Sequence, residues 1–250
     1  MRKKVVVYLM VLSISSLSFG QSIKDTSLLM NMFSFHVSGH VPGGAIAQRY
    51  GMNMGVGGSY MLKLASGWML AADFTFFSGN DFKADSVFDA VRDEYGDFIN
   101  TFGEIGEAAF YERGFYTGLR AGKLFPIIGP NPNSGIVVLL SGGLLQYKTL
   151  IHQDGREVPY ILEDYSKGYV RLTNGFGLSQ FIGYLHLDSH EPINFYVGFE
   201  FHQAWTKNRR DWNFDSMEKD LNLYNDYLFG IRFGWIFPIN KNTVDTYYYY

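Results

Sequence analysis

Large apolar residues alternate with small or polar residues along positions 52–79. The apolar residues occupy the even positions from 52 to 64 and again from 68 to 76. Successive side chains of a β-strand point to opposite faces, so this period of two predicts two strands with unlike faces, separated by a turn at 65–67. One face is bulky and apolar, whereas the other is small or polar and contains glycine.

The same alternation predicts six further strands. They lie at about 29–38, 113–125, 136–149, 169–185, 193–202 and 225–237. The segment at 136–149 is apolar on both faces, which leaves its register open.

The connections between these strands alternate in length. The links at 65–67, 126–135 and 187–192 are short, and those at about 39–51, 79–112, 150–168 and 206–224 are longer. A membrane β-barrel whose chain starts in the periplasm has short periplasmic turns and longer outer loops. The alternation therefore favours such a barrel over a soluble β-sandwich, which has no reason to gather its long loops at one end.

The first 20 residues have the pattern of a secretory signal peptide. A basic start, "MRKK", is followed by an apolar stretch and by small residues at Ser18 and Gly20. We therefore predict a signal peptide at 1–20 that is cleaved after Gly20, a barrel at 21–238 and a periplasmic C-terminal tail at 239–250.

Composition excludes several other classes of protein. The chain has no cysteine, which excludes a lipid-modified cysteine anchor and a disulfide framework. Its apolar runs after the signal peptide are far shorter than the roughly 20 residues of a membrane helix. Aromatic residues nevertheless make up 18% of the chain, and the net charge of −3 argues against a nucleic acid partner. No motif predicts a cofactor.

In a barrel that faces lipid, the bulky apolar face points outward and the small, polar face fills the interior. Eight strands enclose a space only wide enough to be filled by side chains. We therefore predict an all-β fold, an eight-stranded antiparallel up-and-down transmembrane β-barrel located in the outer membrane.

Charged residues on the inner face are expected to satisfy one another as a polar network in the lumen. The predicted members of this lumen network are Lys63, Asp73, Arg120, Arg171, Glu200, His202 and Arg232. Three tryptophans are predicted to anchor the barrel at the membrane interfaces. Trp68 and Trp235 fall near periplasmic strand ends, and Trp205 falls near an outer end.

The last strand resembles the terminal signal that the barrel assembly machinery reads. Gly230, Phe233 and Trp235 give a Gly-x-x-aromatic-x-aromatic pattern, although Leu228 stands at a usually polar position and the chain continues beyond the strand. Wider stretches are similar to a family of small outer-membrane β-barrels of Bacteroidota, namely 114–136, 169–184, 193–201 and 206–215. The resemblance implies outer-membrane lipid and the assembly machinery as partners, with accessory roles in type IX secretion or outer-membrane assembly.

The loop at 79–112 carries the clearest candidate for a binding surface. It is acidic, and its apolar residues recur at helical spacing, which predicts a short amphipathic helix at about 85–102. The apolar face of this helix is expected to dock a protein partner through Phe88, Val91, Tyr95, Phe98 and Phe102. The alternative is that this face covers the barrel rim.

Two other functions stay open. The lumen network is interpreted as a static plug of salt bridges or, alternatively, as the gate of a narrow channel, and the narrow lumen favours the plug. A lipid-modifying enzyme would draw on Ser179, His186, His190, Glu200 and His202, but no nucleophile elbow, zinc motif or phosphate loop accompanies them. The sequence thus favours a non-enzymatic accessory or scaffold subunit that acts through its outer loops.

A basic pair in the last long loop has two interpretations. Arg209 and Arg210 could bind anionic lipid headgroups, or they could pair with Asp211 and Asp215. We favour the pairing as the simpler of the two.

Overall fold

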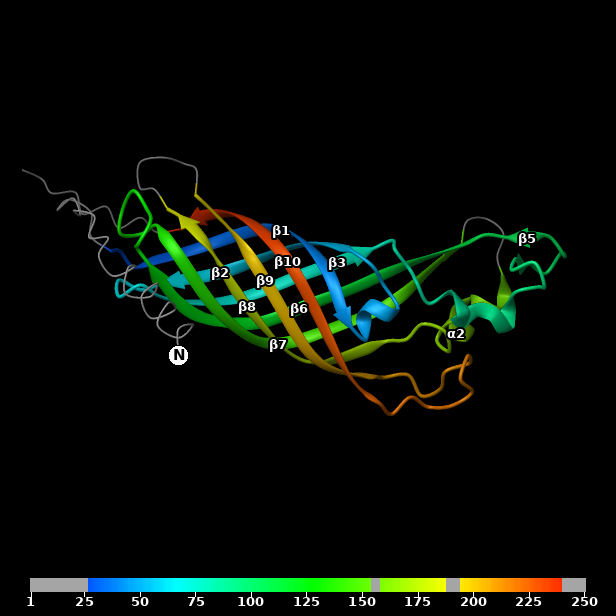
Figure 1. The fold of residues 1–250 in the computed structure, drawn as a ribbon. Helices are drawn as coiled ribbons and strands as arrows, with labels where there is room; N and C mark the ends of the chain where they lie inside the picture. Colours follow the sequence, from blue (N-terminus) through cyan, green and yellow to red (C-terminus); the bar gives the residue numbers. More distant parts are fainter. Residues whose placement is uncertain (1–26, 154–157, 188–193, 240–250) are drawn as a thin grey trace, which may run out of the picture.

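The chain forms a closed, eight-stranded antiparallel β-barrel (Figure 1). This computed structural model describes residues 27–153, 158–187 and 194–239. The barrel strands are β1 (Met30–Gly44), β2 (Asn53–Lys63), β3 (Trp68–Gly79), β6 (Ala108–Phe125), β7 (Gly135–Gln153), β8 (Thr173–His186), β9 (Phe195–Asn208) and β10 (Leu223–Pro238). Each pairs with the next barrel strand along the chain, and β1 pairs with β10 to close the barrel. This confirms the predicted fold class.

Three predictions from the sequence fall partly or wholly outside the described residues. They concern the signal peptide at 1–20, His190, and the C-terminal tail beyond residue 239.

The register of β7, which the sequence leaves open, follows from its two neighbours. Ser141 lies opposite Arg120 of β6 and opposite Ser179 of β8. Residues paired across an antiparallel sheet share a face, so Ser141 points inward with these two polar residues. Alternate residues of β7 from Val137 to Thr149 therefore line the interior.

Several strands extend beyond the ends that alternation predicts. β1 continues to Gly44, β6 begins at Ala108 and β7 ends at Gln153. Backbone pairing continues as far as the pair Ala108 and Gln153, where the outward face is no longer consistently apolar. At the end of the barrel that carries the longer loops, called here the long-loop end, the β6–β7 hairpin consequently projects past the other strands (Figure 1).

The outer surface of the barrel is apolar and its inner face is largely small and polar. Phe199 is 67% exposed, whereas Glu200, the next residue of β9, is 2% exposed. Exposed apolar side chains on the outer surface include Phe35, Val56, Leu70, Leu119, Leu140, Ile182 and Ile231. A continuous apolar surface of this extent is unfavourable in water and matches a hydrocarbon environment.

The interior is filled in layers along the barrel. An apolar layer that includes Met32, Met61 and Met69 occupies the short-turn end, opposite the long-loop end. A second layer, rich in aromatic residues such as Tyr116 and Tyr147, occupies the long-loop end. Charged residues lie between these two layers. The inner face is thus less uniformly polar than alternation predicts, because both ends of the lumen are closed by apolar side chains.

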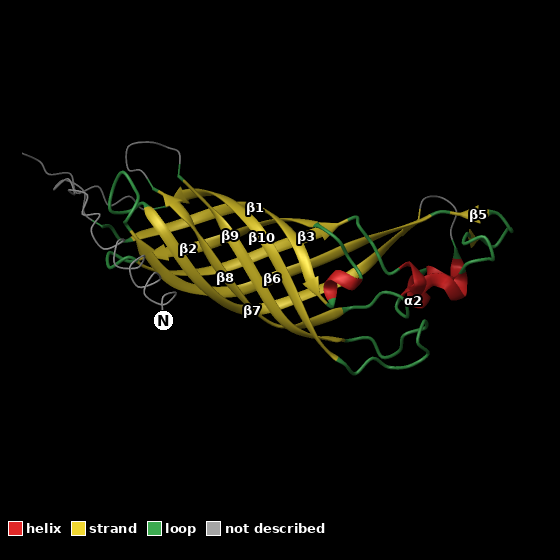
Figure 2. Ribbon diagram, in the orientation of Figure 1, coloured by secondary structure: helices red, strands yellow, loops and turns green. Residues whose placement is uncertain are grey.

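A small packed region covers the long-loop end, and we call residues 80–107 and 158–170 the outer platform. Its core comprises the buried residues Val87, Phe88, Phe98, Val158, Ile161 and Tyr169. The short helices of the described chain gather mainly in this region, including α2 (Glu163–Ser166) (Figure 2). The platform is therefore an ordered structure with its own apolar core.

The amphipathic helix predicted at 85–102 is wrong in extent and type. A 3₁₀ helix covers Asp85–Val91 only. It is followed by a small hairpin, in which β4 (Phe98–Ile99) pairs with β5 (Ile105–Gly106). Within the described residues, no helix has the length and hydropathy needed to cross a membrane.

Candidate functional site

Four charged side chains from four strands meet at the centre of the barrel. They are Asp73 of β3, Arg120 of β6, Glu200 of β9 and Arg232 of β10. The Arg120 guanidinium donates to Asp73 Oδ2 at 2.8 Å and to Glu200 Oε1 at 2.6 Å. Arg232 donates from Nη1 to Asp73 Oδ1 at 2.9 Å, and its Nε lies 2.9 Å from Glu200 Oε2.

These contacts form a closed ring in which each carboxylate touches both guanidinium groups. The four side chains are at most 4% exposed. Two charges of each sign offset one another, which is the condition under which charged groups can be buried. A cavity of only about 10 Å³, room for about one water molecule, lies beside Arg120. The ring and its neighbours therefore plug the lumen.

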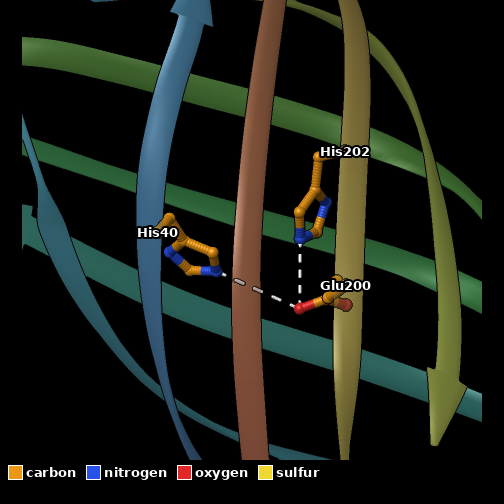
Figure 3. A group of neighbouring side chains, drawn as sticks. All are labelled: His40, Glu200 and His202. Atoms are coloured by element: carbon orange, nitrogen blue, oxygen red, sulfur yellow. Dashed lines mark ion pairs between the residues drawn. The ribbon is translucent and has the colours of Figure 1, made fainter.

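Two histidines approach the same carboxylate (Figure 3). His202 Nε2 lies 3.2 Å from Glu200 Oε2, and His40 Nε2 lies 4.0 Å from it. On its other side, His40 Nδ1 lies 2.9 Å from Asn53 Oδ1. The Asn53 amide in turn donates to Glu112 Oε2 at 2.9 Å. Hydrogen bonds therefore link β6 through β2 to His40 of β1, whose Nε2 faces Glu200 of β9 without a hydrogen bond.

Sequence reasoning missed some members of this polar layer. His36 Nε2 lies 2.9 Å from Thr75 Oγ1, which also accepts a hydrogen bond from Arg232. Alternation places His36 and Thr75 on the inner face, so a signal for both was present. His40 lies beyond position 38, where the apolar alternation of the first strand ends.

Two predicted members of the lumen network lie elsewhere, so this part of the prediction is wrong. Lys63 is the last residue of β2, and its ammonium donates to Asn133 Oδ1 at 2.8 Å at the short-turn end. Arg171 precedes β8, which begins only at Thr173, and it pairs with Asp215 in the long loops. Both side chains are separated along the barrel from the central ring.

A second polar cluster, also missed, lies among the aromatic side chains at the long-loop end. Asp226 accepts hydrogen bonds from Tyr147 at 2.7 Å and from the backbone N–H of Ile46 at 2.8 Å. Tyr50, which is fully buried, shares a hydrogen bond of 2.7 Å with Thr149. Burial raises the pKa of Tyr50 to about 12, so its hydroxyl stays neutral. These contacts hold the loop between β1 and β2 over the barrel mouth.

The five predicted docking residues do not share one surface. Phe88 and Phe98 are 0% and 5% exposed and belong to the platform core. Val91 is partly buried against that core. Tyr95 and Phe102, in contrast, are 81% and 86% exposed. The predicted docking residues therefore form two groups, one that packs in or against the platform core and one that the platform exposes to solvent.

Tyr95 and Phe102 occupy the same place in two matching turns, 93–97 and 100–104. In each turn, the side-chain oxygen of the first residue accepts the backbone N–H groups of the third and fifth residues. A glycine with positive φ, 89° in one turn and 78° in the other, follows each aromatic residue. Both rings are thus held in solvent by turns whose backbone is fixed locally.

The three predicted anchor tryptophans lie on the barrel wall. Trp68 and Trp235 are 52% and 50% exposed near the short-turn end. Trp205 lies toward the other end of β9, where its ring stacks on Phe176 with centroids 6.5 Å apart. Their role at the membrane interfaces stays a prediction.

The candidate catalytic residues are not arranged for lipid chemistry. Ser179 is 2% exposed and donates to Glu200 Oε1 at 3.1 Å, inside the plugged lumen. His186 lies at the end of β8 and packs against Phe195. Among the described residues, no serine and histidine form a hydrogen-bonded pair that faces the lipid.

The predicted pairing of Arg209 and Arg210 with nearby acids is wrong. Arg209 donates to a side-chain amide and Arg210 to a backbone carbonyl. The nearby acids pair with other cations. Asp211 pairs with Lys219 at the end of the same loop, and Asp215 pairs with Arg171, which precedes β8.

A closed antiparallel barrel with an apolar outer surface and a plugged, charged interior defines a transmembrane β-barrel of the outer-membrane type. No family model and no curated protein sequence matches the chain. Among solved structures, the chain is similar to Ail, the attachment invasion locus protein of Yersinia pestis, with 8% identity and a TM-score of 0.44, covering 84% of this chain and 100% of that one.

It is also similar to the outer membrane protein OprG from Pseudomonas aeruginosa, with 12% identity and a TM-score of 0.44, covering 86% of this chain and 99% of that one. Neisserial surface protein A has 8% identity and a TM-score of 0.41, covering 82% of this chain and 96% of that one. At these identities and TM-scores, the similarities carry no information about function.

Proposed function

We propose that this chain is a non-enzymatic outer-membrane barrel that serves as an accessory or scaffold subunit and binds a protein partner at the cell surface. The observation that carries this proposal is the pair of matching turns on the outer platform. Each turn presents one aromatic ring, Tyr95 or Phe102, that is more than four-fifths exposed.

Exposed aromatic rings on ordered turns have the properties of a protein-binding surface. Aromatic residues are enriched at protein interfaces, and a few of them tend to supply most of the binding free energy. The platform core and the turn hydrogen bonds fix the backbone that carries both rings before a partner binds. Less conformational entropy is therefore lost on association than with flexible loops.

The barrel itself supports a scaffold role. Its lumen is plugged at the central ring, so transport through the barrel is disfavoured, and three of the candidate catalytic residues, Ser179, Glu200 and His202, are buried in that plug. The apolar outer surface would contact outer-membrane lipid, with Trp68, Trp205 and Trp235 as interface anchors. The terminal pattern of β10 suits recognition by the barrel assembly machinery. A secretion or outer-membrane assembly complex of Bacteroidota is the setting that we propose for the partner.

Replacing Tyr95 and Phe102 by serine tests this proposal. We expect the double variant to fold and insert normally, because both rings are exposed. The partner that co-purifies from native membranes in mild detergent is expected to fall by more than about tenfold, because central aromatic residues dominate interface energy. Quantitative mass spectrometry of material purified from wild-type and variant membranes would measure this loss.

Met217 and Leu221 provide a matched control. They are 69% and 74% exposed in the last long loop, outside the two turns. Serine at both positions should leave the partner bound. Undiminished co-purification with the Tyr95 and Phe102 variant, or equal loss with the control, would overturn the assignment of the docking surface to the turns.

A further inference from the structure

We propose that His40, Glu200 and His202 bind one divalent transition-metal ion of the zinc class inside the barrel. One ligand atom from each residue lies within 4.8 Å of the other two. His40 extends from β1, and Glu200 and His202 extend from β9, with β10 passing between them (Figure 3). All three residues are buried. Two imidazoles and one carboxylate are a common ligand set for zinc.

The hydrogen bonds of His40 leave its second nitrogen ready to bind an ion. The Asn53 amide nitrogen donates to Glu112, so the Asn53 carbonyl oxygen faces His40 Nδ1 at 2.9 Å. A carbonyl oxygen only accepts hydrogen bonds, so Nδ1 carries the ring proton. Nε2 of neutral His40 is then an unprotonated acceptor, and no hydrogen-bond partner is found for it.

This acceptor is aimed at a second acceptor. His40 Nε2 and Glu200 Oε2 face one another at 4.0 Å in the buried interior. Arg232 Nε already lies 2.9 Å from this oxygen, but His40 Nε2 has no donor facing it, and an ion bound by both atoms would give His40 Nε2 its missing partner. The arrangement also matches known metal sites, in which a histidine ligand donates its other ring N–H to a fixed acceptor. Here that acceptor is Asn53, which Glu112 holds in place.

The distances suit tetrahedral coordination. Ligand atoms about 2.0–2.1 Å from a tetrahedral ion lie roughly 3.4 Å from one another. Glu200 Oε2 and His202 Nε2 are 3.2 Å apart, close to this value, and His40 Nε2 needs to approach Glu200 Oε2 by less than 1 Å. A carboxylate oxygen has two lone pairs, so Oε2 can keep its contact with Arg232 while it binds the ion. Nitrogen ligands and the small ligand number disfavour magnesium and calcium.

A bound ion would connect β1 to β9 across β10. It would therefore reinforce the seam where β1 and β10 close the barrel. Because the ligands are buried, the ion is expected to enter while the chain folds and to exchange slowly afterwards. Metal binding inside the barrel is independent of partner docking at the outer platform.

The test is to fold the urea-denatured chain into detergent with zinc or magnesium alone, remove free metal with a chelator, and measure metal per chain. We expect about one zinc ion per folded chain and no retained magnesium. X-ray absorption should show two imidazole nitrogens and at least one oxygen at about 2.0–2.1 Å from zinc. Cobalt in place of zinc should give the visible absorption of a four-coordinate ion.

Variants identify the site. His40→Gln with His202→Gln should reduce retained zinc from about one ion per chain to near zero. His36→Gln, which changes another buried histidine of the lumen, should retain it. The cobalt spectrum of the unaltered chain decides the matter if the double variant does not fold. A wild-type barrel that retains no metal, or unchanged retention in a folded double variant, would overturn the proposal.

Discussion

Replacing Arg232 by methionine is expected to lower the free energy of unfolding by about 3–5 kcal/mol, because it leaves two buried carboxylates with one counter-ion. Asp73 and Glu200 would then share Arg120 alone, in a layer closed on both sides by apolar side chains. Urea unfolding in detergent micelles, followed by the mobility of unboiled protein on a denaturing gel, would measure the loss.

Two comparisons distinguish the loss of a buried ring member from the loss of an ion pair elsewhere in the protein. Arg171→Met breaks the pair with Asp215 in the long loops and should cost less than about 1 kcal/mol, because that pair lies nearer solvent. Adding Asp73→Asn to Arg232→Met should restore part of the stability, because it rebalances the buried charge. If Arg232→Met lowers the free energy of unfolding no more than Arg171→Met does, the central ring does not stabilise the barrel as described.

Replacing Phe199 by arginine is expected to destabilise the inserted barrel by about 2–4 kcal/mol, because the cation would face the middle of the bilayer. Phe199 is 67% exposed and pairs with Ile182 and Ile231, which are also exposed apolar residues. The fraction of chain folded in vesicles at increasing urea concentration would measure the effect.

Phe199→Leu is the matched control, because it keeps an apolar side chain toward lipid. The sequence alone suggests Gly198→Ala as a tolerated change at an inward position. The structure corrects this expectation, because a Cβ at Gly198 would lie 2.5 Å from Gly183 Cα on the neighbouring strand. Equal stability of Phe199→Arg and Phe199→Leu would show that this face does not contact lipid.

The strands could be predicted because the two faces of each strand meet different environments. Lipid outside and side chains inside impose a period of two, as at Phe199 and Glu200, and this period is visible in the sequence. The strand ends could not be placed in the same way. Beyond the apolar band both faces meet water or protein, so the pairing of Ala108 with Gln153 continues without a periodic signal.

The helix predicted at 85–102 failed for a different reason. The spacing of its apolar residues arises from a 3₁₀ helix, two turns and a hairpin. Phe88 and Phe98 reach one core from different elements, whereas Tyr95 and Phe102 are exposed on the turns. A signal was nevertheless present. Gly96 and Gly103 interrupt the segment, and each follows an aromatic residue in a turn that begins with Asp93 or Asn100.

The central ring could be predicted only as a set of inward charges. Asp73, Arg120, Glu200 and Arg232 follow from alternation, but their meeting at one level depends on the stagger of the strands around the barrel. Lys63, in contrast, is the last residue of β2, so its place beside the short turn at 65–67 could be read from the sequence. A single sequence contains no direct record of this stagger.

The most direct test of the proposed barrel orientation is the accessibility of single cysteines on intact cells. The natural chain has no cysteine, so one introduced thiol reports one position. Phe102→Cys, on the outer platform, should react with a membrane-impermeant maleimide on intact cells. Ile128→Cys, which is 64% exposed in the natural residue and lies between β6 and β7 at the short-turn end, should react only after the outer membrane is permeabilised. Labelling of position 128 but not 102 on intact cells would show that the outer platform does not face the cell exterior.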